Sequence, residues 1–85
     1  MNRLFLQKAI NKLNEDILIK FGISNSIYLD YTEAAICINF LRNNYNEILD
    51  SKDPKAYIYS YYEDPLADKM YKLLMAASVK FKFYY

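Results

Sequence analysis

The sequence predicts an all-α fold: a compact small bundle of three long helices plus one short helix, in a single domain over residues 1–85. Apolar residues recur at intervals of three and four over long stretches, which is the spacing of one helical face. Capping residues and the two prolines stand where helices are expected to begin. A chain of this length buries roughly 60% of the surface it exposes when unfolded, which suffices for one thin core.

The first long helix is expected over residues 2–21. Asn2 is placed to cap its start, and Gly22 stands where a left-handed residue commonly ends a helix. The apolar stripe consists of Leu6, Ile10, Leu13, Ile17 and Phe21. Polar residues occupy the other side, so we expect an amphipathic helix.

The second long helix is expected from about residue 32 to residue 49. Asp30 and Glu33 have the spacing of a capping box at its start. Its apolar residues spread over more than one side, which is typical of a central helix. They are Ala34, Ala35, Ile36, Cys37, Ile38, Phe40, Leu41, Tyr45, Ile48 and Leu49. An alternative interpretation makes residues 35–41 a buried strand.

Two Asp-Pro pairs punctuate the second half of the chain, at Asp53-Pro54 and Asp64-Pro65. Each offers an N-cap acceptor followed by a proline at the first helical position, where the missing N–H costs nothing. The second pair predicts a helix from residue 65 to at least residue 78. Its stripe consists of Leu66, Met70, Leu73, Leu74 and Ala77.

Two further segments fit either a helix or a strand. Residues 56–62 and residues 79–85 are rich in aromatic and β-branched side chains that alternate as strands would. If both were strands, the chain would be α+β. A lone pair of strands is marginal in water, so we favour the all-α fold, with the short helix between the two Asp-Pro pairs.

Composition argues against the common catalytic mechanisms. The chain has no His and a single Cys, so it lacks the ordinary ligands of zinc and copper and the His general base of many enzymes. Its one glycine leaves no glycine-rich phosphate loop. The apolar neighbours of Cys37 predict a small buried side chain. We expect a protein that is not an enzyme and uses no metal or other cofactor.

Charge and hydropathy narrow the range of partners. The formal net charge of +1 is spread without a basic arm, so nucleic-acid binding is not favoured. The longest apolar run, residues 34–38, is far shorter than the roughly 20 residues of a membrane-spanning helix. Residues 4–6 are followed directly by Gln7 and Lys8, which breaks any signal-peptide pattern. We expect a cytoplasmic protein without a membrane partner.

Tyrosine is the compositional oddity, because it supplies 10 of the 15 aromatic residues. Four of these tyrosines fall in one six-residue window, and at least one ring must face outward whether that window is helix or strand. Tyrosine is enriched in binding hot spots. The predicted partner-binding residues are Tyr57, Tyr59, Tyr61, Tyr62, Glu63 and Asp64. The alternative is that these rings only cover a thin core.

The C-terminal part of the chain interleaves cations and aromatic rings. Such a pattern suits phosphate pairing and base stacking on a single-stranded nucleic acid, or contacts in a homodimer. The candidate residues are Lys69, Lys72, Lys80, Lys82, Tyr84 and Tyr85. In the alternative interpretation the aromatic residues close the core and the lysines stay solvated.

These patterns favour a small non-enzymatic protein that binds a macromolecular partner and can inhibit it. We expect this partner to be a protein. The prevalence of Asn, Ile, Lys, Tyr and Phe fits an AT-rich genome, such as that of a phage or another mobile element. In size and composition the chain resembles bacteriocin immunity proteins and anti-CRISPR inhibitors, although no motif matches them. A small nucleic-acid-binding regulator is the alternative function.

Overall fold

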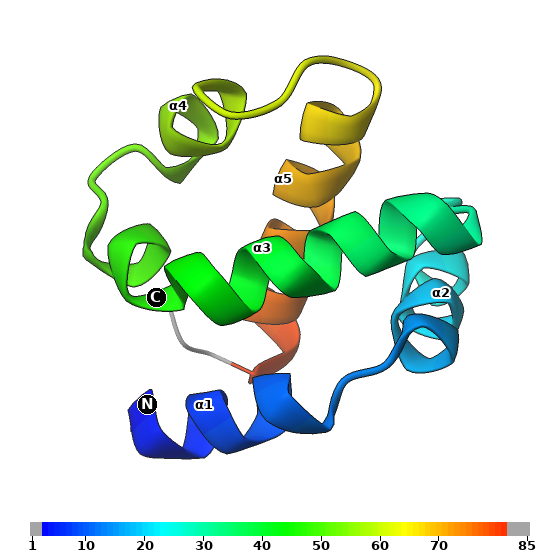
Figure 1. The fold of residues 1–85 in the computed structure, drawn as a ribbon, viewed down its shortest axis with the longest axis horizontal. Coiled ribbons are helices and arrows are strands. Elements are labelled where there is room, and N and C mark those ends of the chain that lie inside the picture. The colour runs from blue at the N-terminus through cyan, green and yellow to red at the C-terminus, as the bar shows by residue number, and fades with distance from the viewer. Residues whose placement is uncertain (1–2, 82–85) are drawn as a thin grey trace.

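Helices account for most of the chain between residues 3 and 81, which are the residues that the computed structural model describes (Figure 1). They are α1 (Arg3–Lys12), α2 (Glu15–Ser24), α3 (Tyr31–Asp50), α4 (Pro54–Tyr59) and α5 (Leu66–Phe81). No strand occurs in this part of the chain. The all-α prediction is therefore confirmed.

The alternative strands are wrong wherever the structure describes them. Residues 35–41 lie in the middle of α3, and residues 56–59 belong to α4, which is followed by a turn. Residues 79–81 complete α5, and residues 82–85 lie outside the described part. The high β propensity of residues 35–41 and 56–59 is overridden because each of these two segments packs one helical face against the core.

The predicted continuous helix over residues 2–21 is wrong, because it is divided into α1 and α2. The side chain of Asn14 accepts a hydrogen bond from the backbone N–H of Ile17 at 2.9 Å and so caps a new helix. Glu15 and Asp16 then stand in its first turn, where the helix dipole favours negative charge. Across the break, the Arg42 side chain donates to the carbonyl oxygen of Leu13 at 2.8 Å. The break thus has its own cap, and a side-chain donor satisfies its Leu13 carbonyl oxygen.

Gly22 does not end a helix in a left-handed conformation, as the sequence predicted. It lies within α2, no described glycine has a positive φ, and Ser26 adopts the left-handed conformation with a φ of 60°. The backbone N–H of Ile27 donates to the carbonyl oxygen of Gly22 at 2.8 Å. A Cβ at Gly22 would lie 2.5 Å from the Ile27 carbonyl oxygen, so glycine is needed here for the close approach of the loop.

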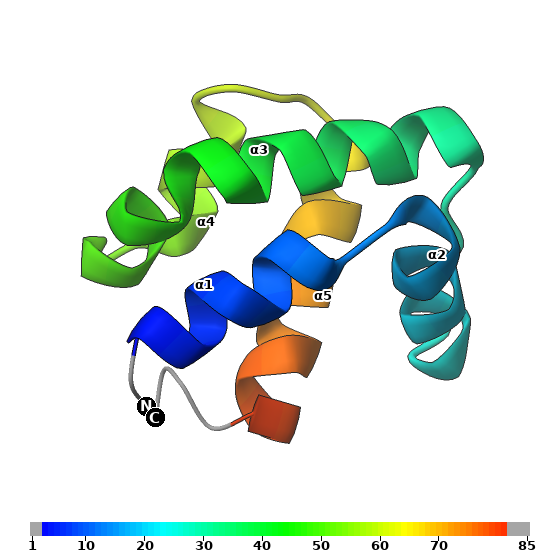
Figure 2. The same ribbon diagram turned by 60° about the horizontal axis from the view of Figure 1, so that its bottom comes forward.

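The capping box at the start of α3 is confirmed. The backbone N–H of Glu33 donates to Asp30 Oδ1 at 2.7 Å, and the backbone N–H of Asp30 donates to Glu33 Oε1 at 3.0 Å. Helix α3 contacts α1, α2 and α4, as expected of a central helix. Figures 1 and 2 show α2 near its N-terminal end and α4 near its C-terminal end. Its buried residues are Ala34, Cys37, Ile38, Phe40 and Ile48.

The two Asp-Pro pairs behave differently. Asp53 caps α4 as predicted, accepting from the backbone N–H of Ala56 at 3.1 Å, with Pro54 as the first helical residue. At the second pair the helix begins one residue later than predicted, at Leu66. Asp64 still accepts a backbone hydrogen bond, from Asp68 at 3.2 Å. Both aspartates thus satisfy N–H groups in the first turn of a helix.

Candidate functional site

Four aromatic rings meet where α4 and the following turn pack on α3. We call Phe40, Tyr57, Tyr61 and Tyr62 the aromatic cluster. The Phe40 ring centroid lies 6.1 Å from that of Tyr57 and 5.3 Å from those of Tyr61 and Tyr62. The rings of Tyr57, in α4, and Tyr61, in the turn after it, are 5.3 Å apart. The Tyr57 hydroxyl donates to Asn44 Oδ1 at 2.9 Å, which ties the cluster to α3.

The cluster presents one tyrosine to solvent. Tyr61 is 58% exposed, whereas Tyr57 and Tyr62 are half-buried and Phe40 is buried. Glu63, close to Tyr61 in sequence, is exposed as well. The predicted partner-binding residues therefore divide into rings that hold the cluster together and a smaller outward surface.

Tyr59 belongs to a different environment. Its hydroxyl donates to Asp64 Oδ1 at 2.6 Å, and this hydrogen bond, together with burial, raises the pKa of Tyr59 to about 12. The Lys55 ammonium group lies 5.9 Å from the Tyr59 ring and 5.6 Å from the Tyr71 ring. The structure thus pairs Tyr59 and Asp64 with each other and does not bring Tyr59 into the aromatic cluster.

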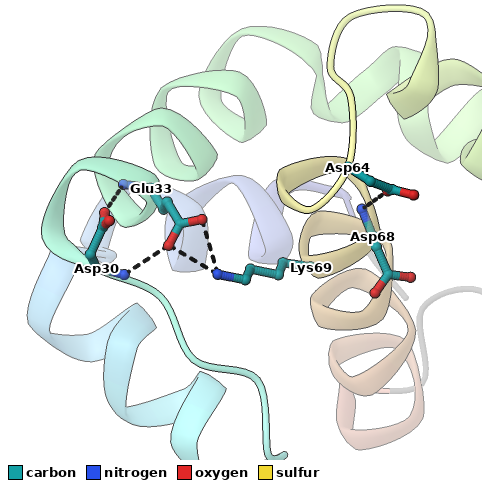
Figure 3. A network of polar contacts seen from close by, with 5 residues as sticks. All are labelled: Asp30, Glu33, Asp64, Asp68 and Lys69. Atoms are coloured by element: carbon teal, nitrogen blue, oxygen red, sulfur yellow. Dashed lines mark hydrogen bonds and ion pairs between the residues drawn. The ribbon is translucent and has the colours of Figure 1, made fainter.

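Three of the lysines singled out in the sequence, Lys69, Lys72 and Lys80, have partners of their own in the described part of the chain. Lys69 Nζ lies 3.1 and 3.0 Å from the two carboxylate oxygens of Glu33, so it joins α5 to the capping box of α3 (Figure 3). Lys72 pairs with Asp68 at 2.9 Å. The Lys80 ammonium group lies 5.6 Å from the ring centroid of Phe21. Lys82, Tyr84 and Tyr85 lie outside the described residues.

Two strongly exposed tyrosines were missed. Tyr28 is 66% exposed and Tyr31 is 63% exposed, and a hydrogen bond to Glu15 raises the pKa of Tyr31. Residues 27–30 alternate between buried Ile27 or Leu29 and an exposed neighbour. This alternation of apolar and polar or amphipathic residues is visible in the sequence and would have placed Tyr28 on the surface.

An apolar cavity of about 660 Å³ lies between α1, α2, α3 and α5. Its wall includes Leu13, Ile17, Phe21, Leu41, Leu74 and Ala77. Among the described lining residues, Lys20 and Lys80 carry the only charges. The sequence did not predict this space, because alanines in a helical stripe look the same whether a neighbour fills the gap or not.

The cavity opens to the surface, because Ile17 lines it and is 47% exposed. Solvent or another molecule can therefore enter the space, which makes the cavity a second candidate site.

Cys37 lies at the inner wall of this cavity and is buried, as predicted. Burial, followed by the nearby negative charge of Glu33, raises the pKa of the Cys37 thiol to about 12. The side chain thus stays protonated at neutral pH and acts as a small apolar group.

The described part of the chain offers little to other kinds of chemistry. Over residues 3–81, no group of three or more His, Cys, Asp or Glu side chains is arranged to hold a metal ion. None of the helices in this range is both long and apolar enough to cross a membrane. Comparison with known proteins gives no match among protein-family models, curated proteins or solved structures. The candidate sites are therefore judged on their geometry alone.

Proposed function

We propose that this chain is a non-enzymatic interaction protein that binds a protein partner through the surface around Tyr61. The exposure of Tyr61 carries the proposal: more than half of the side chain is open to solvent, while its ring contacts Phe40 and Tyr57. A ring already held in place loses less conformational freedom when it binds, so more of its contact energy is retained. Tyrosine in such a position is a common binding hot spot.

The charge beside Tyr61 indicates the chemistry of the partner. Glu63 is exposed close to Tyr61 in sequence, and Glu47, near Tyr57, is exposed on α3. A partner that offers Arg or Lys side chains to this surface would combine ion pairing with contact on the tyrosine ring. Where the covered surface of that partner is its working site, binding would inhibit it, which is how an immunity or anti-defence protein acts.

Single substitutions test this proposal better than replacing all the tyrosines together. Tyr57 and Tyr62 hold the aromatic cluster, so their loss would disturb folding as well as binding. Tyr61→Ser removes the exposed ring of the cluster, and Tyr28→Ser is the control because Tyr28 is similarly exposed elsewhere, at 66%. We expect Tyr61→Ser to weaken binding of a native partner at least tenfold, while Tyr28→Ser leaves it unchanged.

The measurement combines affinity capture from the source cell with photo-crosslinking from position 61. A protein that is captured by the wild-type chain and by Tyr28→Ser, and that crosslinks at position 61, would support the proposal. Circular dichroism of each variant verifies that the helices remain. Equal capture by Tyr61→Ser and the wild type would refute the assignment of this surface.

A further inference from the structure

We propose that the cavity between α1, α2, α3 and α5 binds a long-chain fatty acid, with the acyl chain inside and the carboxylate at Lys20 and Lys80. This site is separate from the proposed partner-binding surface, because Tyr61 does not line the cavity. The two proposals therefore stand or fall on different residues.

The dimensions and the wall of the cavity fit an acyl chain. Its volume of about 660 Å³ lies within the range of ~300–1,000 Å³ that is typical of small-molecule sites. The space reaches the core, since buried Cys37 and Ile58 line it, and it reaches the surface, since Ile17 lines it and is 47% exposed. An elongated apolar ligand can thus enter beside α2 and extend inward.

The charges at the wall select an anionic head group. Lys20 and Lys80 both contribute to the lining, and no Asp or Glu is among the described lining residues. The Lys80 ammonium group lies 5.6 Å from the ring centroid of Phe21, so the C-terminal part of α5 is close to the stretch of α2 that also carries Lys20. Lys20 forms no ion pair with a described residue. A carboxylate beside Lys20 would gain an ion-pair partner without displacing a described acidic side chain from Lys20.

The polar groups near Lys20 leave the head-group role to the lysines. The Ser24 hydroxyl donates to the carbonyl oxygen of Lys20 at 3.1 Å, and the Asn25 amide donates to that of Phe21 at 2.9 Å. Both groups line the cavity but already bond within their own helix. We therefore expect the site to bind a fatty acid more tightly than a fatty alcohol because of charge pairing with Lys20 and Lys80, and not because of hydrogen bonds to neutral groups.

The test compares palmitate with 1-hexadecanol, which has the same chain length and no charge. Native mass spectrometry counts bound molecules per chain, and calorimetric titration gives the affinities. We expect one palmitate per monomer. Lys20→Gln/Lys80→Gln should weaken palmitate binding about tenfold, equivalent to ~1.4 kcal/mol, and leave hexadecanol binding unchanged. Lys8→Gln/Lys52→Gln is the matched control, because it removes the same charge from lysines outside the cavity.

A second variant tests the cavity itself. Ala77 lines the space, so Ala77→Phe should fill part of it and reduce the affinity for both ligands more than tenfold. If Ala77→Phe does not fold, the comparison of palmitate with hexadecanol in the lysine variants still tests whether the cavity binds a fatty acid. The proposal is overturned if the wild-type chain takes up no palmitate, if the lysine variants bind it equally well, or if the cavity is closed by a second copy in a dimer.

Discussion

Replacing Gly22 by alanine sets two opposing effects against each other. In an ordinary helix interior, alanine is more stable than glycine by about 1 kcal/mol. Here the new Cβ would lie 2.5 Å from the backbone carbonyl oxygen of Ile27, which no side-chain rotation can relieve. The loop must move away, which weakens the 2.8 Å hydrogen bond between the Ile27 N–H and the Gly22 carbonyl.

The magnitudes decide the sign of the effect. Displacing packed groups costs ~1–3 kcal/mol. The hydrogen bond contributes about 1 kcal/mol. After subtracting the helix-propensity gain, we expect Gly22→Ala to lower the free energy of unfolding by about 2 kcal/mol. For a domain of this size that corresponds to a fall in Tm of about 8–16 °C.

Chemical denaturation followed by circular dichroism measures this difference. Ile23→Ala is the control, because Ile23 is the next residue in α2 and is exposed, so its replacement should change the free energy of unfolding by less than ~0.5 kcal/mol. If Gly22→Ala is as stable as the wild type or more so, the loop after α2 does not close on Gly22 and the reasoning fails.

Substitutions at three further contacts test the structure. Asn14→Ala should lower the free energy of unfolding by about 1 kcal/mol and Asn14→Ser should restore it, as denaturation would show, because the cap of α2 is lost and regained. Lys69→Met should cost about 1 kcal/mol because Glu33 loses its partner, and Glu33→Gln in the same chain should recover most of it. The hydrogen bond from Tyr59 to Asp64 raises the pKa of Tyr59 to about 12, above its ordinary value. Its contribution to the stability of the fold is therefore complete below pH ~10 and is lost as the pH rises through 12. Asp64→Asn should therefore lower the pKa of Tyr59, which ultraviolet difference spectra recorded against pH would show. An unchanged pKa would contradict this hydrogen bond.

Local signals account for the parts of the fold that the sequence predicted correctly. The capping box of Asp30 and Glu33 and the Asp53-Pro54 pair act through hydrogen bonds within one turn, so their spacing alone reveals them. The break at Asn14 was missed because the apolar stripe stays in phase on both sides of it. Gly22 was misread because its role depends on Ile27, which approaches it only after the loop has turned.

In the candidate sites, too, local sequence patterns predicted some features and tertiary contacts determine the others. The helical spacing predicted that Tyr57 and Tyr61 lie on one side, and their rings do meet, although α4 ends at Tyr59 and Tyr61 lies in the turn. Tyr59 is held apart from them by its hydrogen bond to Asp64. The cavity depends on the spacing between helices distant in sequence, which no local pattern encodes. Tertiary contacts, rather than residue type, thus decide which tyrosines face outward and where space remains.

Phe40 links the two proposed sites, because its ring supports Tyr61 in the aromatic cluster and also lines the cavity. A substitution at Phe40 would change both sites at once, so its effect could not be assigned to one site or the other. Tyr61 lies outside the cavity lining, and Lys20 and Lys80 lie outside the aromatic cluster. Loss of partner capture in Tyr61→Ser with palmitate binding intact, and the reverse in Lys20→Gln/Lys80→Gln, would establish two independent activities on one small domain.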